Sequence, residues 1–68
     1  MKIEYDQEAD AAYIYFEYPL KDGAVKDTRV FNDDIIIDYD AQKKVIGIEI
    51  LNASKQLKKE FLKTLLPA

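Results

Sequence analysis

Four aspartates, Asp33, Asp34, Asp38 and Asp40, form the densest group of potentially reactive side chains in the sequence. Carboxylate oxygens are the ligands that Ca²⁺ and Mg²⁺ prefer in proteins. Their spacing does not follow the EF-hand pattern, which needs ligands at alternate positions, a glycine and a later glutamate. Asp33 and Asp34 precede an apolar segment that Asp40 follows, and a strand of about 3.3 Å per residue would hold the two ends far apart. We therefore predict that these acids serve turn formation and solubility and bind no metal ion.

Asp38 and Glu49 are a second pair of carboxylates, which we expect to project from the same face of a sheet. Glycosidases use two carboxylates at a fixed separation. The expected register places Asp38 opposite Val45 and Glu49 opposite Asp34, so the two are not direct neighbours. A chain of 68 residues also has little room for a cleft that would enclose a sugar.

Other catalytic arrangements are missing from the sequence. The chain contains no histidine and no cysteine, which excludes the commonest general base, the commonest metal ligand and every disulfide. Ser54 and Thr28 therefore have no histidine to activate them as nucleophiles. Gly23 and Gly47 are isolated, so no glycine-rich loop is available for phosphate. We predict no catalytic residue, no cofactor and no metal ion, and hence a protein that is not an enzyme.

Charge is distributed unevenly along the chain. The net charge of −3 divides into −6 over residues 1–54, from 12 acidic and six basic residues, and +3 over residues 55–68, from four lysines and one glutamate. The acidic part would repel nucleic acid and anionic membranes. No apolar run approaches the roughly 18–20 residues of a membrane span, and the N-terminus has no apolar signal region. We expect no nucleic-acid partner, no membrane contact and a cytoplasmic location.

Apolar periodicity predicts one α+β domain over residues 1–68. Segments of period two or rich in β-branched and aromatic residues predict an antiparallel, four- to five-stranded β-meander sheet over about 2–51, with strands at 2–6, 11–18, 24–31, 35–39 and 44–51. A segment rich in Leu and Lys predicts one C-terminal α-helix over about 54–66, capped by Asn52 or Ser54 and packed on one face of the sheet.

Strand pairing divides the predicted sheet into two faces. Pairing Tyr39 with Lys44 sets Ile37 opposite Ile46, and pairing Ile3 with Ile14 extends the same apolar inner face. The predicted core, including residues from the helix, comprises Ile3, Ile14, Phe16, Ile35, Ile37, Ile46, Ile48, Ile50, Leu57, Phe61 and Leu65.

The opposite, outer face is the candidate partner interface. It carries Tyr13, Tyr15, Ile36, Asp38, Val45, Gly47 and Glu49. Aromatic residues are enriched at the centres of interfaces, although exposed tyrosines are also ordinary. A glycine in mid-strand marks a bulge or a close approach, for which a partner backbone is one candidate. The apolar arc of the predicted helix is wider than a small sheet can cover, so a homodimer through the helix edge or the outer sheet face is also expected.

Two stretches of sequence resemble a known family. Ile3-Glu4-Tyr5-Asp6 with Glu8-Ala9-Asp10-Ala11, and later Gly47-Ile48-Glu49-Ile50-Leu51, are similar to the opening and closing motifs of short prokaryotic proteins catalogued as domain of unknown function 2283. Gln7 and Gln42-Lys43 depart from the family pattern, at turns. The resemblance implies a compact antiparallel sheet with a helix, no established enzymatic activity, and for some members a role as antitoxins that bind small ribonuclease-like toxins.

Together these observations predict a small, non-enzymatic protein-interaction module. Its expected partner is a small basic protein, in the manner of an antitoxin that neutralises a ribonuclease-like toxin. Two alternatives stay open, a structural homo-oligomer without a heterologous partner and a small-ligand or metal-binding protein.

Overall fold

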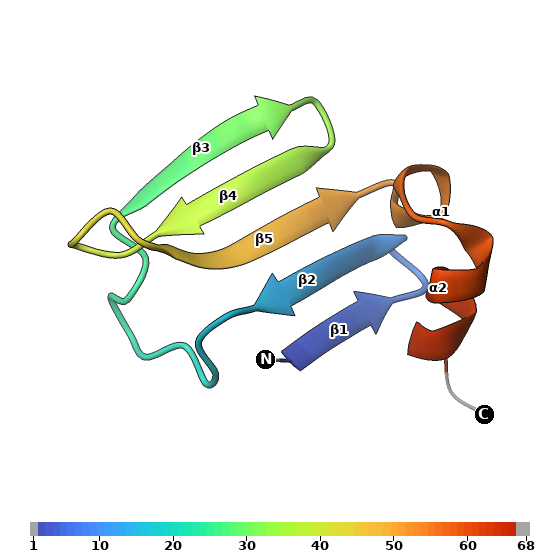
Figure 1. The fold of residues 1–68 in the computed structure, drawn as a ribbon, viewed down its shortest axis with the longest axis horizontal. Coiled ribbons are helices and arrows are strands. Elements are labelled where there is room, and N and C mark those ends of the chain that lie inside the picture. Colours follow the sequence, from blue (N-terminus) through green and yellow to red (C-terminus); the bar gives the residue numbers. More distant parts are fainter. Residues whose placement is uncertain (1, 67–68) are drawn as a thin grey trace.

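The computed structural model describes residues 2–66, and Met1, Pro67 and Ala68 lie outside the described residues. Five strands and two short helices follow one another along the chain (Figure 1): β1 (Lys2–Asp6), β2 (Ala11–Tyr15), β3 (Asp27–Asn32), β4 (Ile35–Tyr39), β5 (Val45–Leu51), α1 (Ala53–Gln56) and α2 (Lys59–Leu65). All neighbouring strands are antiparallel, which confirms the predicted α+β class and antiparallel sheet.

The order of the strands across the sheet is β1-β2-β5-β4-β3. The meander prediction therefore holds for β3, β4 and β5 but is wrong between β2 and β3, because residues 16–26 carry the chain to the far edge of the sheet. The burial of the strands explains this order. Every residue of β3, Asp27–Asn32, is exposed and suits an edge, whereas the apolar β5 lies in the centre.

The register of β4 against β5 is shifted by two residues from the prediction. Ile37 lies opposite Ile48 rather than Ile46, and Ile35 lies opposite Ile50. One residue of the shift comes from the turn, where the Asp40 amide donates to the Lys44 carbonyl at 2.9 Å. The other comes from a bulge in β5, where the register changes between Asp38 and Tyr39. Because the total shift is even, the apolar side chains stay on the predicted face.

The inner face is apolar, but few of its side chains are fully buried. The predicted pairing of β1 with β2 is confirmed, since Ile3 lies opposite Ile14 and Tyr5 opposite Ala12. Ala12, Ile46, Ile50 and Ala53 are the buried hydrophobic residues among those described. Most of the predicted core is only half-buried, namely Ile3, Ile14, Ile35, Ile37, Ile48, Leu57 and Leu65. Phe16 and Phe61 are 49 % and 41 % exposed, so for them the prediction of a core position is wrong.

The single helix predicted over 54–66 is divided into α1 and α2 by extended backbone at Leu57 and Lys58. In one continuous helix Leu57 and Leu62 would point about 140° apart. With the break, both side chains pack against the cluster of Ala12, Ile50 and Ala53. The two helices thus contact the inner face at one end of the sheet (Figure 1).

In the described part of the chain, neither helix has the length and apolar character required to cross a membrane.

The start of α1 is held by the turn between β1 and β2 rather than by a cap of its own. Asn52 occupies the N-cap position, one of the two predicted, but its backbone is left-handed and its side chain makes no capping hydrogen bond. Instead, the Asp10 carboxylate accepts hydrogen bonds from the Ser54 amide at 3.0 Å and the Ser54 hydroxyl at 2.6 Å. The Tyr5 hydroxyl donates to the same carboxylate at 2.8 Å. Asp10 therefore ties α1 to both strands of the first hairpin.

Asp34 holds the same helix from the other side. Its carboxylate accepts hydrogen bonds from the side-chain amides of Asn52 at 3.0 Å and Gln56 at 2.8 Å. Turn formation is confirmed directly at Asp40, whose carboxylate accepts from the amides of Gln42 and Lys44. Asp38, by contrast, lies within β4 and forms no turn. Asp34 also lies in a turn, and its carboxylate in addition holds α1 against the sheet.

We expect Asp10 to make folding sensitive to acid. Hydrogen bonds from Ser54 and then Tyr5 hold the pKa of Asp10 below its ordinary value. This contribution to stability is complete above the ordinary pKa and is lost as the pH falls through the lowered value. Asp10→Asn, which tolerates the positive φ of this position, should therefore flatten the acid limb of a plot of melting temperature against pH.

Asp33→Asn is the matched control, because Asp33 is exposed and no described hydrogen bond involves its carboxylate. Asp10→Ala should lower the melting temperature at neutral pH by roughly 4–8 °C, the effect of losing one helix cap in a domain of this size. An acid limb that is as steep in Asp10→Asn as in the wild type would contradict this role.

Candidate functional site

Six of the seven residues predicted for the partner interface share the outer face of the sheet. Glu49 lies opposite Tyr13 on one side and Ile36 on the other, and Gly47 lies between Tyr15 and Asp38. Val45 is the exception. The bulge in β5 pairs Val45 with Tyr39, which lies on the inner face together with Ile35 and Ile37. The prediction of Val45 on the outer face is therefore wrong.

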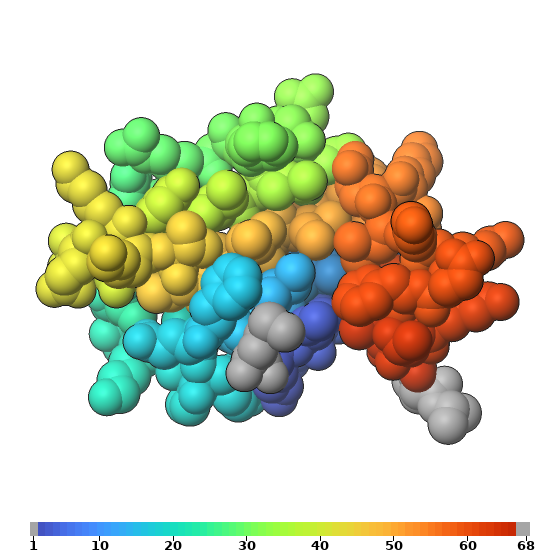
Figure 2. All heavy atoms as spheres, viewed as in Figure 1, coloured from blue at the N-terminus to red at the C-terminus, as the bar shows by residue number. Residues whose placement is uncertain are grey.

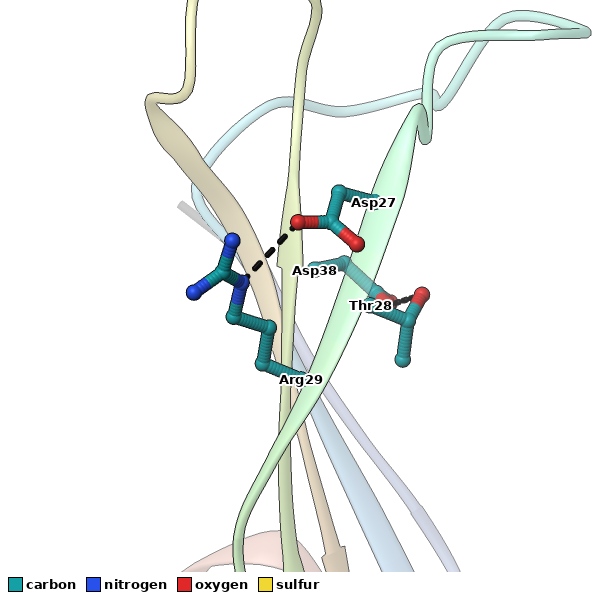
Figure 3. A network of polar contacts seen from close by, with 4 residues as sticks. All are labelled: Asp27, Thr28, Arg29 and Asp38. Carbon is teal, nitrogen blue, oxygen red and sulfur yellow. Dashed lines mark hydrogen bonds and ion pairs between the residues drawn. The ribbon is translucent and has the colours of Figure 1, made fainter.

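Tyr13 stands at the centre of the outer face and is anchored by a hydrogen bond. Its hydroxyl donates to Asp38 Oδ2 at 2.6 Å. The Thr28 hydroxyl donates to the other oxygen, Asp38 Oδ1, at 2.7 Å (Figure 3). Both oxygens of this carboxylate therefore have a partner. Burial raises the pKa of Tyr13 far above its ordinary value, and the bond to Asp38 acts in the same direction, so the phenol remains a donor.

Gly47 allows Tyr13 to reach Asp38 across β5. A Cβ atom built on Gly47 would overlap the hydroxyl and the ring carbons of Tyr13. The close approach that a mid-strand glycine predicts is thus made by a side chain of the same chain, and the predicted bulge lies beside it. A partner backbone is not needed to explain this glycine.

The tyrosines continue as an aromatic row toward the end of β2. The rings of Tyr13 and Tyr15 have centroids 4.6 Å apart, and Tyr15 meets Tyr18 edge-on at 5.0 Å. The Lys2 ammonium lies 4.2 Å from the centre of the Tyr18 ring and 3.0 Å from its hydroxyl. The one basic side chain that β1 contributes is therefore already held by an aromatic ring.

Acidic side chains surround Tyr13 and form no ion pair among the described residues. The register places Glu4 and Glu49 opposite Tyr13 on its two sides, and a shallow hollow beside Tyr13 is lined by Glu4, Asp6 and Glu49. Among residues 2–66, Arg29 and Asp27 form an ion pair, and it lies on the inner face of the sheet (Figure 3). The outer face therefore presents negative charge around an aromatic centre.

The carboxylate pair Asp38 and Glu49 lies on the outer face in a register that differs from the expected one. Asp38 lies opposite Gly47 and Glu49 opposite Ile36, so the expected partners Val45 and Asp34 were wrong, but the two carboxylates are indeed not direct neighbours. Within the described residues there is no group of three acidic side chains placed to hold a metal ion.

Sequence reasoning missed three contributors to this surface, Glu4, Asp6 and Thr28. The alternation of Glu4 and Asp6 with Ile3 and Tyr5 was a sufficient signal, because it places both acids on the face opposite the core. Thr28 was missed since the register of β3 depends on a bulge between Val30 and Asn32, which the sequence does not reveal.

Comparison with known proteins gives a family but no activity. Residues 2–54 match the model of a family described as "Protein of unknown function (DUF2283)". An uncharacterized protein of Methanocaldococcus jannaschii, MJ0789, is 47 % identical over 55 residues, which are 81 % of this chain and 43 % of that protein. The chain thus spans less than half the length of this relative. No solved structure matches this chain. The chain belongs to the DUF2283 family of proteins of unknown function.

Proposed function

We propose that this chain is a non-catalytic protein-interaction module that binds a small basic protein through its outer face. The observation that carries the proposal is the hollow lined by Glu4, Asp6 and Glu49 beside Tyr13. A lysine or arginine side chain of a partner would enter this hollow and meet carboxylates that form no ion pair among the described residues. Tyr13 and Tyr15 would supply apolar contact area at the centre, where aromatic residues carry much of the binding energy.

Electrostatics would act mainly on the rate of association. Negative charge concentrated on one face attracts a basic surface from a distance and orients it before contact. The net charge of residues 1–54 is −6, whereas the lysines of the last segment lie in and around the helices at one end of the sheet. The outer face and the helical end therefore differ in sign, which favours one orientation of a basic partner.

The kind of partner is suggested by the family resemblance. A ribonuclease-like toxin needs a basic active site to bind RNA phosphates. An acidic sheet face that covers such a site would block access of RNA, which is neutralisation by occlusion. This role requires no catalytic residue on the side of the neutralising protein.

The experiment is a pull-down from the native host with three forms of the tagged chain, followed by mass spectrometry. Glu4→Gln/Glu49→Gln removes two charges from the outer face without changing side-chain size. Glu8→Gln/Glu60→Gln removes two charges from the first turn and from α2 and is the matched control. We expect the wild type and the control to retain a stoichiometric small basic protein, and the outer-face variant to retain at least tenfold less.

Equal retention by both variants would show that the outer face is not the binding surface. Recovery of no stoichiometric basic protein by the wild type would refute the proposal. Where a basic protein is recovered, its cleavage of RNA with and without the wild-type chain tests the antitoxin role.

A further inference from the structure

The inner face of the sheet carries a row of isoleucines that crosses four strands. Ile3 lies opposite Ile14, Ile14 opposite Ile48, and Ile48 opposite Ile37, so that β1, β2, β5 and β4 contribute one residue each. We call these four side chains the isoleucine row. The next row toward the helices contains Ala12 and Ile50, which are 2 % and 6 % exposed. Every member of the isoleucine row, by contrast, remains partly exposed.

The helices do not extend over the isoleucine row. Viewed along the shortest axis of the molecule, α1 and α2 lie at one end of the strands and leave most of the sheet uncovered (Figure 1). The space-filling view likewise shows the helices gathered at one end (Figure 2). An apolar sheet face normally packs against a second layer, and here the helices provide such a layer at one end only.

The dimensions of the chain measure how much surface is left open. A compact monomer of 7.9 kDa typically exposes about 4,400 Å², whereas this chain exposes 5201 Å². The radius of gyration is 12.4 Å, against about 11 Å for a compact domain of this length. The excess of about 800 Å² equals the share that each partner contributes to a standard protein–protein interface.

The charges of the two faces identify the occupant. On the inner face the charged strand residues are Asp27 and Arg29, which neutralise each other in an ion pair of 3.0 Å. A basic partner would find no net negative charge there. Two acidic outer faces would repel each other if two copies of the chain met there. The inner faces carry no net charge on their strands, so two copies can meet there without this repulsion.

We propose that the inner face is the interface of a homodimer, in which two sheets pack face to face across their isoleucine rows. Such a dimer is isologous, and its layers resemble a β-sandwich with sheets about 10 Å apart. Phe16 and Val45, 49 % and 41 % exposed, belong to the same face and extend the apolar contact. The dimer would supply the core that each chain lacks, which matters because a chain without cysteine cannot use disulfides.

This interface differs from the helix edge and the outer sheet face that the sequence suggested for a homodimer. It also leaves the outer faces of both copies free. The proposal is therefore independent of the basic partner, and each can fail without the other.

The test compares two lysine substitutions on neighbouring residues of β4. Ile37 belongs to the isoleucine row, whereas Ile36 points to the outer face. Light scattering coupled to size-exclusion chromatography should give twice 7.9 kDa for the wild type and for Ile36→Lys. Ile37→Lys should be monomeric or should raise the dissociation constant at least 100-fold, because an isologous interface receives the substitution twice.

A second measurement does not depend on the folding of any variant. The melting temperature of the wild type should rise with protein concentration, since dissociation and unfolding are linked in such a dimer. A concentration-independent wild-type monomer would overturn the proposal. Dissociation by Ile36→Lys but not by Ile37→Lys would overturn it in favour of an outer-face dimer.

Discussion

Gly47→Ala is expected to lower the free energy of unfolding by about 2 kcal/mol, within the usual range for overpacking. The added Cβ would overlap Tyr13, so the ring must move off β5. Movement of the ring breaks the hydrogen bond of 2.6 Å to Asp38, and a hydrogen bond to a charged group is worth roughly 1.5–3 kcal/mol.

Introducing Gly47→Ala into a Tyr13→Ala variant shows how much of the destabilisation comes from overlap with the Tyr13 ring. Without the ring, Gly47→Ala should be neutral or slightly stabilising, because glycine in a strand interior is itself unfavourable. Chemical denaturation of the four proteins of this double-mutant cycle, at one protein concentration, gives the coupling energy. Equal destabilisation in both backgrounds would show that Tyr13 does not explain the glycine.

Ile50→Ala should be the most damaging single truncation, with a cost of about 3 kcal/mol. Ile50 is 6 % exposed, lies opposite both Ala12 and Ile35, and supports the docked helices through Ala53. Few large side chains share its burial, so neighbouring residues have little capacity to compensate for a cavity. In a small domain a loss of this size is a large part of the total stability.

Val30→Ala is the control for Ile50→Ala, because Val30 is 67 % exposed on the edge strand β3. Its cost should stay within about 0.5 kcal/mol. Denaturation midpoints measured at one protein concentration allow the comparison. Costs of similar size at the two positions would mean that the cluster around Ile50 is not the core of the fold.

The two faces of the sheet could be predicted from the sequence because side-chain alternation survives errors in register. The shift of two residues between β4 and β5 left Ile35, Ile37, Ile48 and Ile50 on the expected face. Val45 was misplaced because it lies at the bulge, where alternation is interrupted. Bulges depend on packing across several strands and leave little local signal in the sequence.

Strand order and helix docking could not be predicted from local pattern. The antiparallel pairing of β2 with β5 joins residues more than 30 positions apart, and no turn between them fixes it. The break at Leu57 and Lys58 likewise depends on the cluster around Ala12, because a propensity argument favours a continuous helix through these residues. Asp10 lies between two predicted strands, and its role at α1 arises only because residues 44 positions apart meet in the fold.

The most direct test of the account measures the rate at which the captured basic protein associates with the chain at low and high salt. Steering by the outer face predicts a rate constant that falls steeply as salt rises, and a smaller decrease for Glu4→Gln/Glu49→Gln than for Glu8→Gln/Glu60→Gln. An association rate that is independent of salt, or equally dependent on it in both variants, would contradict the claim that the acidic outer face recognises a basic partner.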